Sequence, residues 1–328
     1  MLVPRYWAEG RVHRPRRGRD GRQITVRRWG WSDASQEAAQ SHADQRAREA
    51  FDRIASGEKA PRREPKVPYN GAEGVPIREE IVARHGETVV TRNSYGALCL
   101  NTPRVLFADI DFPESVGFVA GFLGSVALGL LVAAGLNLIG MGRYAIVAGV
   151  IALASGPWIV NRLYLSWCES RGGMQQVARE RVVRFLSRNP HWSLSLYRTP
   201  AGLRVMALHQ LFDPNGDECQ ALFRSLRCDP IYAAMCRRQA CFRARVSPKP
   251  WRVGLKERLR PRPGVWPINP ERLPDRLAWI ANYERASEGF AACRYLDTLG
   301  SAMTHPDALE VQRLHDKLSN ARSDRPIA

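Results

Sequence analysis

The sequence lacks the paired cysteines and the signal peptide that are typical of secreted proteins, and it lacks the cysteine spacing that is typical of structural zinc sites. Its seven cysteines are an odd number and include no C-x-x-C pair, although four of them gather in one region: Cys219, Cys228, Cys236 and Cys241. We therefore expect reduced thiols in a cytoplasmic protein, with a zinc site at this group as the lesser alternative. Residues 1–20 lack the apolar core of a signal peptide and are already rich in arginine. No internal repeat is present.

Charge is also missing from two long stretches. Val116–Met141 contains no charged side chain over about 26 residues, and Tyr144–Asn161 adds about 18 more beyond Gly142 and Arg143. Runs of this length predict two membrane-spanning helices, and so short a connection makes them antiparallel. A helical pair buried in a soluble core is the alternative, but such helices normally keep a polar stripe.

Small residues recur at every fourth position in both apolar runs, which places them on one helix face. This spacing predicts a seam along which the two helices pack closely. The seam residues are Gly117, Gly121, Ser125, Gly129 and Ala133 in the first run, and Ala148, Ala152 and Gly156 in the second.

The distribution of arginine predicts the orientation of this hairpin. The connection carries Arg143 alone, whereas five arginines follow the second run: Arg162, Arg171, Arg179, Arg181 and Arg184. The positive-inside rule then places both termini in the cytoplasm, as expected for a two-pass protein of a bacterial inner membrane.

The chain as a whole is strongly basic, with a formal net charge of +17, almost all of it outside the hairpin. An excess of this size favours anionic partners, which are either the lipid headgroups of the bilayer or nucleic acid. Arginine supplies most of the charge and suits bidentate contacts with phosphate.

Residue patterns before the hairpin predict a strand-rich region. Two strands at Tyr6–His13 and Gln23–Trp31 flank a basic, glycine-rich turn, and Ser32-Asp33 is the expected N-cap of a helix to Ala55. A linker follows at residues 56–70. The expected elements after it are a helix at Pro76–His85 and strands at Thr88–Arg92, Gly96–Leu100 and Val105–Asp111.

After the hairpin, the patterns predict a helix, a strand pair and further helices. The expected ranges are a helix at Gly173–Ser187, strands at Trp192–Tyr197 and Leu203–His209, helical residues 217–243 broken at Asp229-Pro230, a basic Pro-rich stretch at 247–267, and helices at Pro274–Leu299 and Pro306–Asn320.

Neither set of strands is numerous enough for a stable sheet alone, so we expect one sheet that joins both. The fold class is then an α/β (α+β) cytoplasmic domain with a mostly antiparallel sheet, interrupted by a two-helix transmembrane hairpin. The expected parts are residues 1–70, a split core of 71–114 and 163–245, the hairpin at 115–162, and a basic C-terminal part at 246–328.

Two acids mark the end of the predicted strand before the hairpin. Asp109 and Asp111 are two positions apart, so both carboxylates lie on the same face of the strand. Such a pair can hold Mg²⁺ or Mn²⁺, which then binds the phosphates of a substrate. A solvated strand end without metal is the alternative, and the pattern alone leaves the two open.

Basic residues nearby are candidate phosphate ligands. Arg198 and Arg204 flank a turn at Gly202, where glycine permits close backbone approach or positive φ. Arg92 opens an RNSYG loop, and His209 and the further acid Asp213 follow the second strand of the pair. The stretch from Cys241 to Arg252 also mixes cations with aromatics, as phosphate or single-strand sites do, although a membrane-surface patch is equally compatible.

The order of these elements resembles the catalytic core of archaeo-eukaryotic primases and primase-polymerases. The resemblance covers roughly Thr88–Pro214 and implies catalytic roles for Asp109, Asp111 and Asp213, with Arg204 in the glycine-containing turn. The chain departs from that family by its membrane hairpin and by the absence of a histidine in the turn. The stretches RNSYGALCLNTP and CFRAR-x-x-PKPWR also look similar to bacterial two-pass membrane proteins of unassigned function.

Three functions are compatible with these residues. The first is a membrane-anchored, metal-dependent enzyme that transfers a nucleotidyl or phosphoryl group. The second is a non-catalytic membrane protein whose basic body binds lipid, nucleic acid or a protein partner. A D-x-D glycosyltransferase ranks last, because little chain precedes Asp109 for a nucleotide-binding half.

Overall fold

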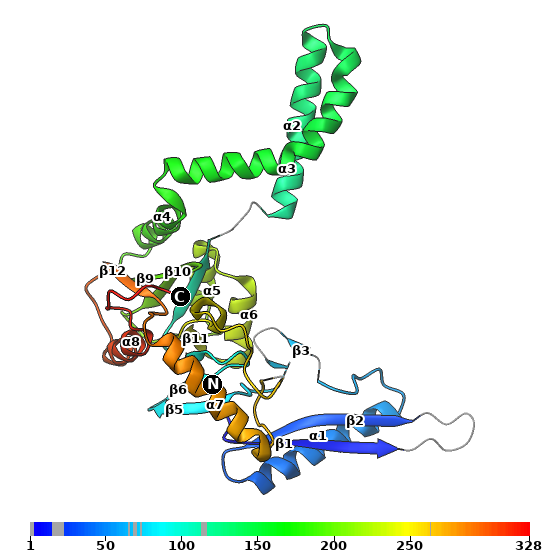
Figure 1. The fold of residues 1–328 in the computed structure, drawn as a ribbon, viewed down its shortest axis with the longest axis vertical. Helices are drawn as coiled ribbons and strands as arrows, with labels where there is room; N and C mark the ends of the chain where they lie inside the picture. Colours follow the sequence, from blue (N-terminus) through cyan, green and yellow to red (C-terminus); the bar gives the residue numbers. More distant parts are fainter. Residues whose placement is uncertain are drawn as a thin grey trace.

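The computed structural model describes residues 3–14, 23–64, 66–67, 71–72, 74–112, 117–262 and 264–328. Its α+β body carries two four-stranded antiparallel sheets, and a helical hairpin projects from one end (Figure 1). The turn predicted between the first two strands, part of the predicted linker and the start of the first apolar run at Val116 lie outside the described residues.

The prediction of a single sheet is wrong, because the strands form two four-stranded sheets. Each of the two joins strands from both sides of the hairpin, as expected. The first has the order β12-β9-β10-β8, with β8 at Phe107–Asp111, β9 at Ser193–Thr199, β10 at Gly202–Ala207 and β12 at Arg294–Gly300. In the register of β10 with β8, Arg204 pairs with Asp109 and Gly202 with Asp111. A Cβ atom at Gly202 would collide with the carbonyl oxygen of Ile110, so close backbone approach, not positive φ, requires glycine there.

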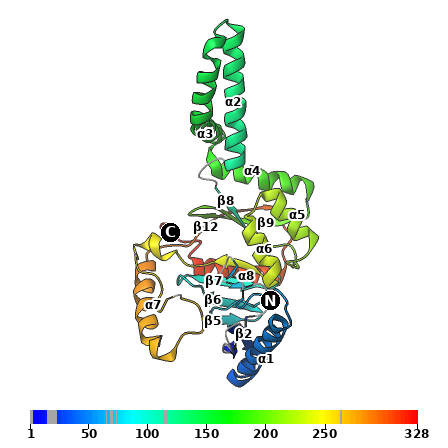
Figure 2. The same cartoon turned by 90° about the vertical axis from the view of Figure 1, so that its right-hand side faces the viewer.

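The second sheet has the order β11-β7-β6-β5, with β5 at Glu80–His85, β6 at Thr88–Arg92, β7 at Leu98–Thr102 and β11 at Phe242–Arg245. The helix predicted at Pro76–His85 is therefore wrong, because its second half is the edge strand β5. The helical prediction for residues 217–243 is also wrong at its end, where β11 begins. Figure 2 shows this sheet beneath the first, farther from the hairpin.

Five helices accompany the two sheets: α4 at Gly173–Arg188, α5 at Asp217–Leu226, α6 at Pro230–Gln239, α7 at Leu273–Ser287 and α8 at Pro306–Ser319. The predicted helix Pro274–Leu299 is too long, because β12 occupies its last part and pairs with β9. One hydrophobic core includes side chains from both sheets and from α4, α5, α6 and α8. The C-terminal part is therefore integrated into the core.

The N-terminal residues form a separate layer at the end of the body away from the hairpin (Figure 1). Strands β1 (Tyr6–Arg14) and β2 (Ile24–Ser32) pair as a two-stranded ribbon, and α1 (Gln36–Ala55) packs across it. The N-cap of α1 is Ser35, whose side chain accepts from the N–H of Ala38, and not the predicted Ser32-Asp33. A short pair, β3 (Lys66–Val67) and β4 (Gly71–Ala72), follows.

The hairpin consists of α2 (Phe118–Leu138), a 3₁₀ turn (Gly142–Tyr144) and α3 (Ala145–Ser170). It projects from the body, and only 11% and 17% of the most apolar windows of its two helices are buried. Helix α3 changes direction along its length (Figure 1), because Pro157 lies inside it and removes a helical hydrogen bond.

The predicted seam of small residues is confirmed at its centre and wrong at its start. Ser125 is buried, and a Cβ atom at Gly156 would collide with its side chain. Gly129 and Gly149 also lie close together. A Cβ atom at Gly117 or Gly121, however, would meet no atom within 4 Å. The helices therefore cross near Ser125 and Gly156 and separate toward Gly117.

Candidate functional site

A cleft of about 420 Å³ lies where the two sheets meet. Its lining comes from the carboxyl end of β8, the β9–β10 turn, the start of α6, the β6–β7 loop and the end of β11 with the residues after it. The cleft contains four acids, Glu79, Asp109, Asp111 and Asp229, and four cations, Arg204, Arg243, Arg245 and Lys249. The contacts of these eight side chains determine which charges remain available to a ligand.

Asp109 is bound by the arginine opposite it. The Nε and Nη2 atoms of Arg204 lie 2.8 and 3.2 Å from the two carboxylate oxygens, in a bidentate ion pair. Burial alone would lower the pKa of Arg204, but the adjacent Asp109 carboxylate raises it above the usual value. Arg204 therefore stays charged, and both Asp109 oxygens are engaged.

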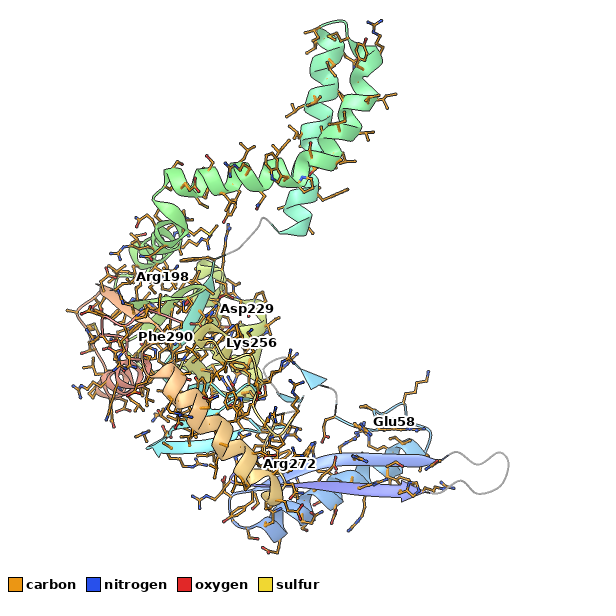
Figure 3. All side chains as sticks on the ribbon, viewed as in Figure 1. Glu58, Arg198, Asp229, Lys256, Arg272 and Phe290 are labelled. Atoms are coloured by element: carbon orange, nitrogen blue, oxygen red, sulfur yellow. The ribbon has the colours of Figure 1, made fainter. Side chains whose placement is uncertain are left out.

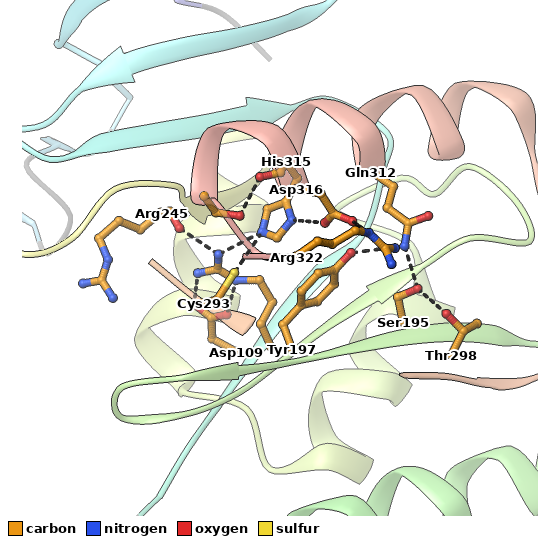
Figure 4. A network of polar contacts seen from close by, with 12 residues as sticks. Asp109, Ser195, Tyr197, Arg245, Cys293, Thr298, Gln312, His315, Asp316 and Arg322 are labelled. Atoms are coloured by element: carbon orange, nitrogen blue, oxygen red, sulfur yellow. Dashed lines mark hydrogen bonds and ion pairs between the residues drawn. The ribbon is translucent and has the colours of Figure 1, made fainter. Parts of the chain in front are cut away.

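Helix α8 contributes to the polar contacts of this arginine through His315, which Figure 4 labels beside Asp316. Arg204 Nη1 donates to the carbonyl oxygen of Arg245 at 2.8 Å and lies 3.2 Å from Nε2 of the buried His315. The other ring nitrogen of His315 contacts Asp316 at 3.1 Å, and Arg322 donates to Asp316 at 2.8 Å. The position of Asp109 thus depends on a polar network that extends to the C-terminal helix.

A second buried ion pair neutralises two more of the eight charges. Arg243 donates to Glu79 at 2.6 and 2.8 Å, and the hydroxyl of Thr91 donates to the same carboxylate at 2.7 Å. This pair joins β11 to the segment before β5 and lines the cleft.

Asp111 differs from Asp109, although both lie on the same strand face. Burial, together with the neighbouring charges of Asp109 and Asp229, raises the pKa of Asp111 above the usual range of an aspartate. Asp229 lies at the N-cap of α6, where it accepts from the N–H of Ile231 at 2.9 Å, and Figure 3 labels it on the body between hairpin and ribbon. Asp111, which is exposed at the end of β8, is thus the cleft acid whose pKa is shifted upward.

The remaining two cations that line the cleft are Lys249 and Arg245. Lys249 is half-buried, and burial together with the positive charges of Arg245 and Arg252 lowers its pKa. Its ammonium nitrogen lies 5.3 Å from the centre of the Trp251 ring, and that ring lies 5.3 Å from the ring of Tyr95. The buried Nε of Arg245 makes no hydrogen bond within the described part of the chain. An anion would relieve the repulsion among these cations.

Two arginines expected to bind phosphate are committed to the protein instead. The buried Arg92 donates to the carbonyl oxygen of Gly96 and to Glu284, each at 3.0 Å, which attaches the RNSYG loop to α7. Arg198 donates to the carbonyl oxygen of Gly202 at 2.9 Å and lies over the ring of Phe112. Both fix loops beside the cleft, and neither is among its lining residues.

Asp213 and His209 lie at the opposite end of β8 from Asp111. The N–H of Phe212 donates to the carbonyl oxygen of Arg104, which precedes β8. About seven residues of extended chain, roughly 20 Å, therefore separate Asp213 from Asp111. His209 is buried against Trp192, and burial lowers its pKa. The expected grouping of Asp213 with Asp109 and Asp111 does not occur.

No metal centre is apparent within the described ranges, where no group of three or more His, Cys, Asp or Glu side chains could hold an ion. The four clustered cysteines are buried and free, and burial raises the pKa of Cys219 and Cys241 to about 12. These cysteines do not come together as a metal-binding group in the described part of the chain, so the structure gives no support to the zinc alternative.

The sequence did contain a signal for the cations that line the cleft, since the mixture of cations and aromatics after Cys241 is the wall that carries Arg245 and Lys249. Comparison of the chain with models of protein families, with curated proteins and with solved structures gives no match. The resemblance to primases therefore stays a prediction, and the function has to be argued from the chemistry of the cleft.

Proposed function

We propose that this chain is a membrane-anchored protein whose α+β body binds a phosphorylated substrate, such as a nucleotide, in the cleft and transfers a phosphoryl or nucleotidyl group. The observation that carries the proposal is that Arg245, Lys249 and Asp111 line the same cleft. The two cations match phosphate charge, and the acid has an environment that favours a proton.

The contacts of each cleft residue indicate its role in the proposed reaction. Lys249 and Arg245 would bind phosphate oxygens, because the repulsion between them falls when an anion lies there. Asp111 would act as general acid or base, since its raised pKa allows it to hold and release a proton closer to neutral pH. Asp109 would not touch the substrate and would keep Arg204, and through it β10, in place.

The carboxylates as arranged do not fit a Mg²⁺ or Mn²⁺ site. Both oxygens of Asp109 face the guanidinium of Arg204, and Asp111 has Arg245 and Lys249 as its cationic neighbours. A divalent ion would need several oxygen ligands in this place. We therefore assign no step to a metal ion.

Two features of the hairpin support the membrane anchor. Helices α2 and α3 are long and apolar enough to cross a bilayer, and their large apolar side chains are mostly exposed, unlike those of a core helix in a soluble protein. The chain between Asp111 and Gly117 can span at most about 3.3–3.6 Å per residue. If the hairpin crosses the bilayer, the cleft therefore lies near the membrane surface. We propose that both termini lie in the cytoplasm, at the inner membrane of a bacterium.

A non-catalytic role is the second candidate, and the Asp109–Arg204 pair favours it. An enzyme of the D-x-D type uses both acids, whereas here one is neutralised by a buried arginine. In that case the cleft would bind a phosphorylated ligand without transforming it.

The decisive experiment compares two lysines of the same loop region, with the full chain held in nanodiscs of neutral lipid. Lys249→Gln removes a cation of the cleft, whereas Lys256→Gln removes an exposed one and serves as the matched control (Figure 3). Titration calorimetry with pyrophosphate and with a nucleoside triphosphate should show about tenfold weaker binding for Lys249→Gln only, the effect of one charged hydrogen bond.

Turnover separates the two candidate functions. Release of phosphate or pyrophosphate from the triphosphate should fall by about 10²-fold or more in Asp111→Asn, with binding retained. Binding without turnover in the parent protein would favour the non-catalytic candidate. If the parent binds neither probe, both candidates fail.

A further inference from the structure

The β1–β2 ribbon has one covered face and one accessible face. Gly10 and Gly30 lie so close to the backbone of α1 at Ala43 that a Cβ atom on either would collide with it. Every second residue along each strand, counted from these two glycines, lies on the same covered face, and the fully buried Val26 is one of them. The alternate positions, Arg11 and Arg27 among them, are therefore directed away from α1.

This ribbon is strongly basic. Residues 3–32 contain nine arginines and two acids. Arg11 and Arg27 lie directly opposite each other in the register, and the N–H of Arg27 donates outward to the carbonyl oxygen of Arg62 at 2.9 Å. Arg11 and Arg27 thus form a non-hydrogen-bonded pair, the kind in which side chains come closest.

Arg11 and Arg27 in the ribbon and Arg62 in the neighbouring segment consequently occupy adjacent backbone positions. Like charges directly opposite each other destabilise a strand pair. The only acid that offsets them in the described residues of the ribbon is Glu9, which is 3.6 Å from Arg27. Arg62 and Arg63 are exposed and extend the same charge, and Arg14 is exposed at the end of β1, on the face of the ribbon that carries Gly10. An anionic partner would relieve this repulsion.

We propose that the basic ribbon, defined by Arg11, Arg14, Arg27, Arg62 and Arg63, binds the phosphates of double-stranded DNA. A two-stranded antiparallel ribbon fits the major groove of B-DNA, which is about 12 Å wide, and arginines on its edges then reach phosphates on both sides. Regularly spaced phosphates match arginines that are repeated along and across the ribbon.

The position of the ribbon distinguishes DNA from the other anionic surface. The ribbon and the hairpin lie at opposite ends of the molecule, with both sheets between them (Figures 1 and 2). Electrostatic attraction falls off within a Debye length of about 8–10 Å, which is less than the thickness of this body. If the hairpin is in the membrane, as proposed above, the ribbon points away from the headgroups of that membrane.

The test uses the full chain in nanodiscs of neutral lipid and a fluorescent 20-base-pair duplex. Arg11→Gln/Arg14→Gln/Arg27→Gln removes three ribbon arginines. Arg48→Gln/Arg188→Gln/Arg313→Gln removes three exposed arginines elsewhere and lowers the net charge equally. Anisotropy titrations over a range of salt concentrations should show at least tenfold weaker binding for the ribbon variant. Its slope of log K against log salt should be about 2–3 smaller than that of the parent.

Three results would overturn the proposal. These are no duplex binding by the parent, equal losses in the two triple variants, or a ribbon variant that loses binding to anionic lipid vesicles but not to the duplex. Melting temperatures of both variants should match the parent, because Arg27 is 33% exposed and the other five substituted side chains are exposed. If the ribbon variant is unfolded, the single variant Arg14→Gln replaces it. The duplex result is independent of pyrophosphate binding in the cleft, so failure of either proposal is recognised separately.

Discussion

Replacing Asp109 by asparagine should destabilise the body, whereas the same replacement at Asp111 should not. The side chain of Arg204 is 2% exposed, and Asp109 is the only acid that forms an ion pair with it in the described part of the chain. Breaking a buried pair by removing one member costs about 3–5 kcal/mol. Asp109 is itself 33% exposed, so water can partly solvate the guanidinium, and we expect about 3 kcal/mol.

At Asp111 we expect the opposite effect on the free energy of unfolding. Burial and two neighbouring carboxylates raise its pKa, which means that the folded protein disfavours its ionised form. A neutral asparagine should therefore change the free energy of unfolding by less than about 1 kcal/mol, and toward stabilisation at neutral pH.

Thermal unfolding of the purified protein in detergent measures this contrast. A loss of about 3 kcal/mol corresponds to a melting temperature lower by about 6–12 °C for a body of this size. The double variant Asp109→Asn/Arg204→Met should regain part of the loss, because it also removes the isolated buried charge. Equal melting temperatures for Asp109→Asn and Asp111→Asn would refute the reasoning, as would a double variant less stable than Asp109→Asn.

Four further predictions concern protons, metal, helix packing and topology. Because the raised pKa of Asp111 makes its protonated form the more compatible with folding, its contribution is complete below about pH 4 and is lost as pH rises through the raised value. Urea unfolding of the parent and of Asp111→Asn should diverge upward from pH 4, and a constant difference would contradict this. Calorimetric titration with Mg²⁺ or Mn²⁺ alone should show no saturable binding, since Arg204 occupies Asp109; binding that Asp109→Asn abolishes would restore the metal-dependent mechanism. Gly156→Leu should reduce cysteine crosslinking between α2 and α3 far more than Gly121→Leu, because only the first new side chain would meet the facing helix; equal yields would argue against the observed crossing. A reporter fused to the C-terminus should score as cytoplasmic, and a periplasmic signal would reverse the proposed orientation.

Local patterns were sufficient for the elements whose residues agree with their surroundings. The alternation of Tyr6–His13, the apolar run at Val105–Asp111 and the periodicity of Gly173–Ser187 each predicted the element found, within a few residues. The joining of strands across the hairpin also followed from sequence, because too few strands on either side could form a stable sheet alone.

The errors arose where distant partners decide the structure. Residues 76–85 contain good helix formers, yet Glu80 is an acceptor for Arg276, which lies 196 residues away, and its strand pairs with β6. The strand β12 likewise depends on β9, about a hundred residues earlier. No local pattern contains these partners.

The same limit applies to the site. The spacing of Asp109 and Asp111 correctly predicts a shared strand face, but it predicts the same role, metal binding, for both acids. Their difference comes from the register of β10, which places Arg204 opposite one acid and Gly202 opposite the other. Asp213 was grouped with them by order along the chain, whereas the strand direction takes it to the far end.

The insertion of the hairpin between β8 and β9 has a consequence for biosynthesis. On the ribosome, β8 emerges before the apolar helices, and its partner β10 emerges only after them. The Asp109–Arg204 contact spans 95 residues, so the cleft cannot close before the whole hairpin has been synthesised. During that interval β8 lacks its partner strand, and an unpaired strand edge is prone to aggregation. If the hairpin enters a bilayer, as proposed above, maturation of this body would depend on how quickly the hairpin is inserted, and a delayed insertion would be seen first as a misfolded cleft.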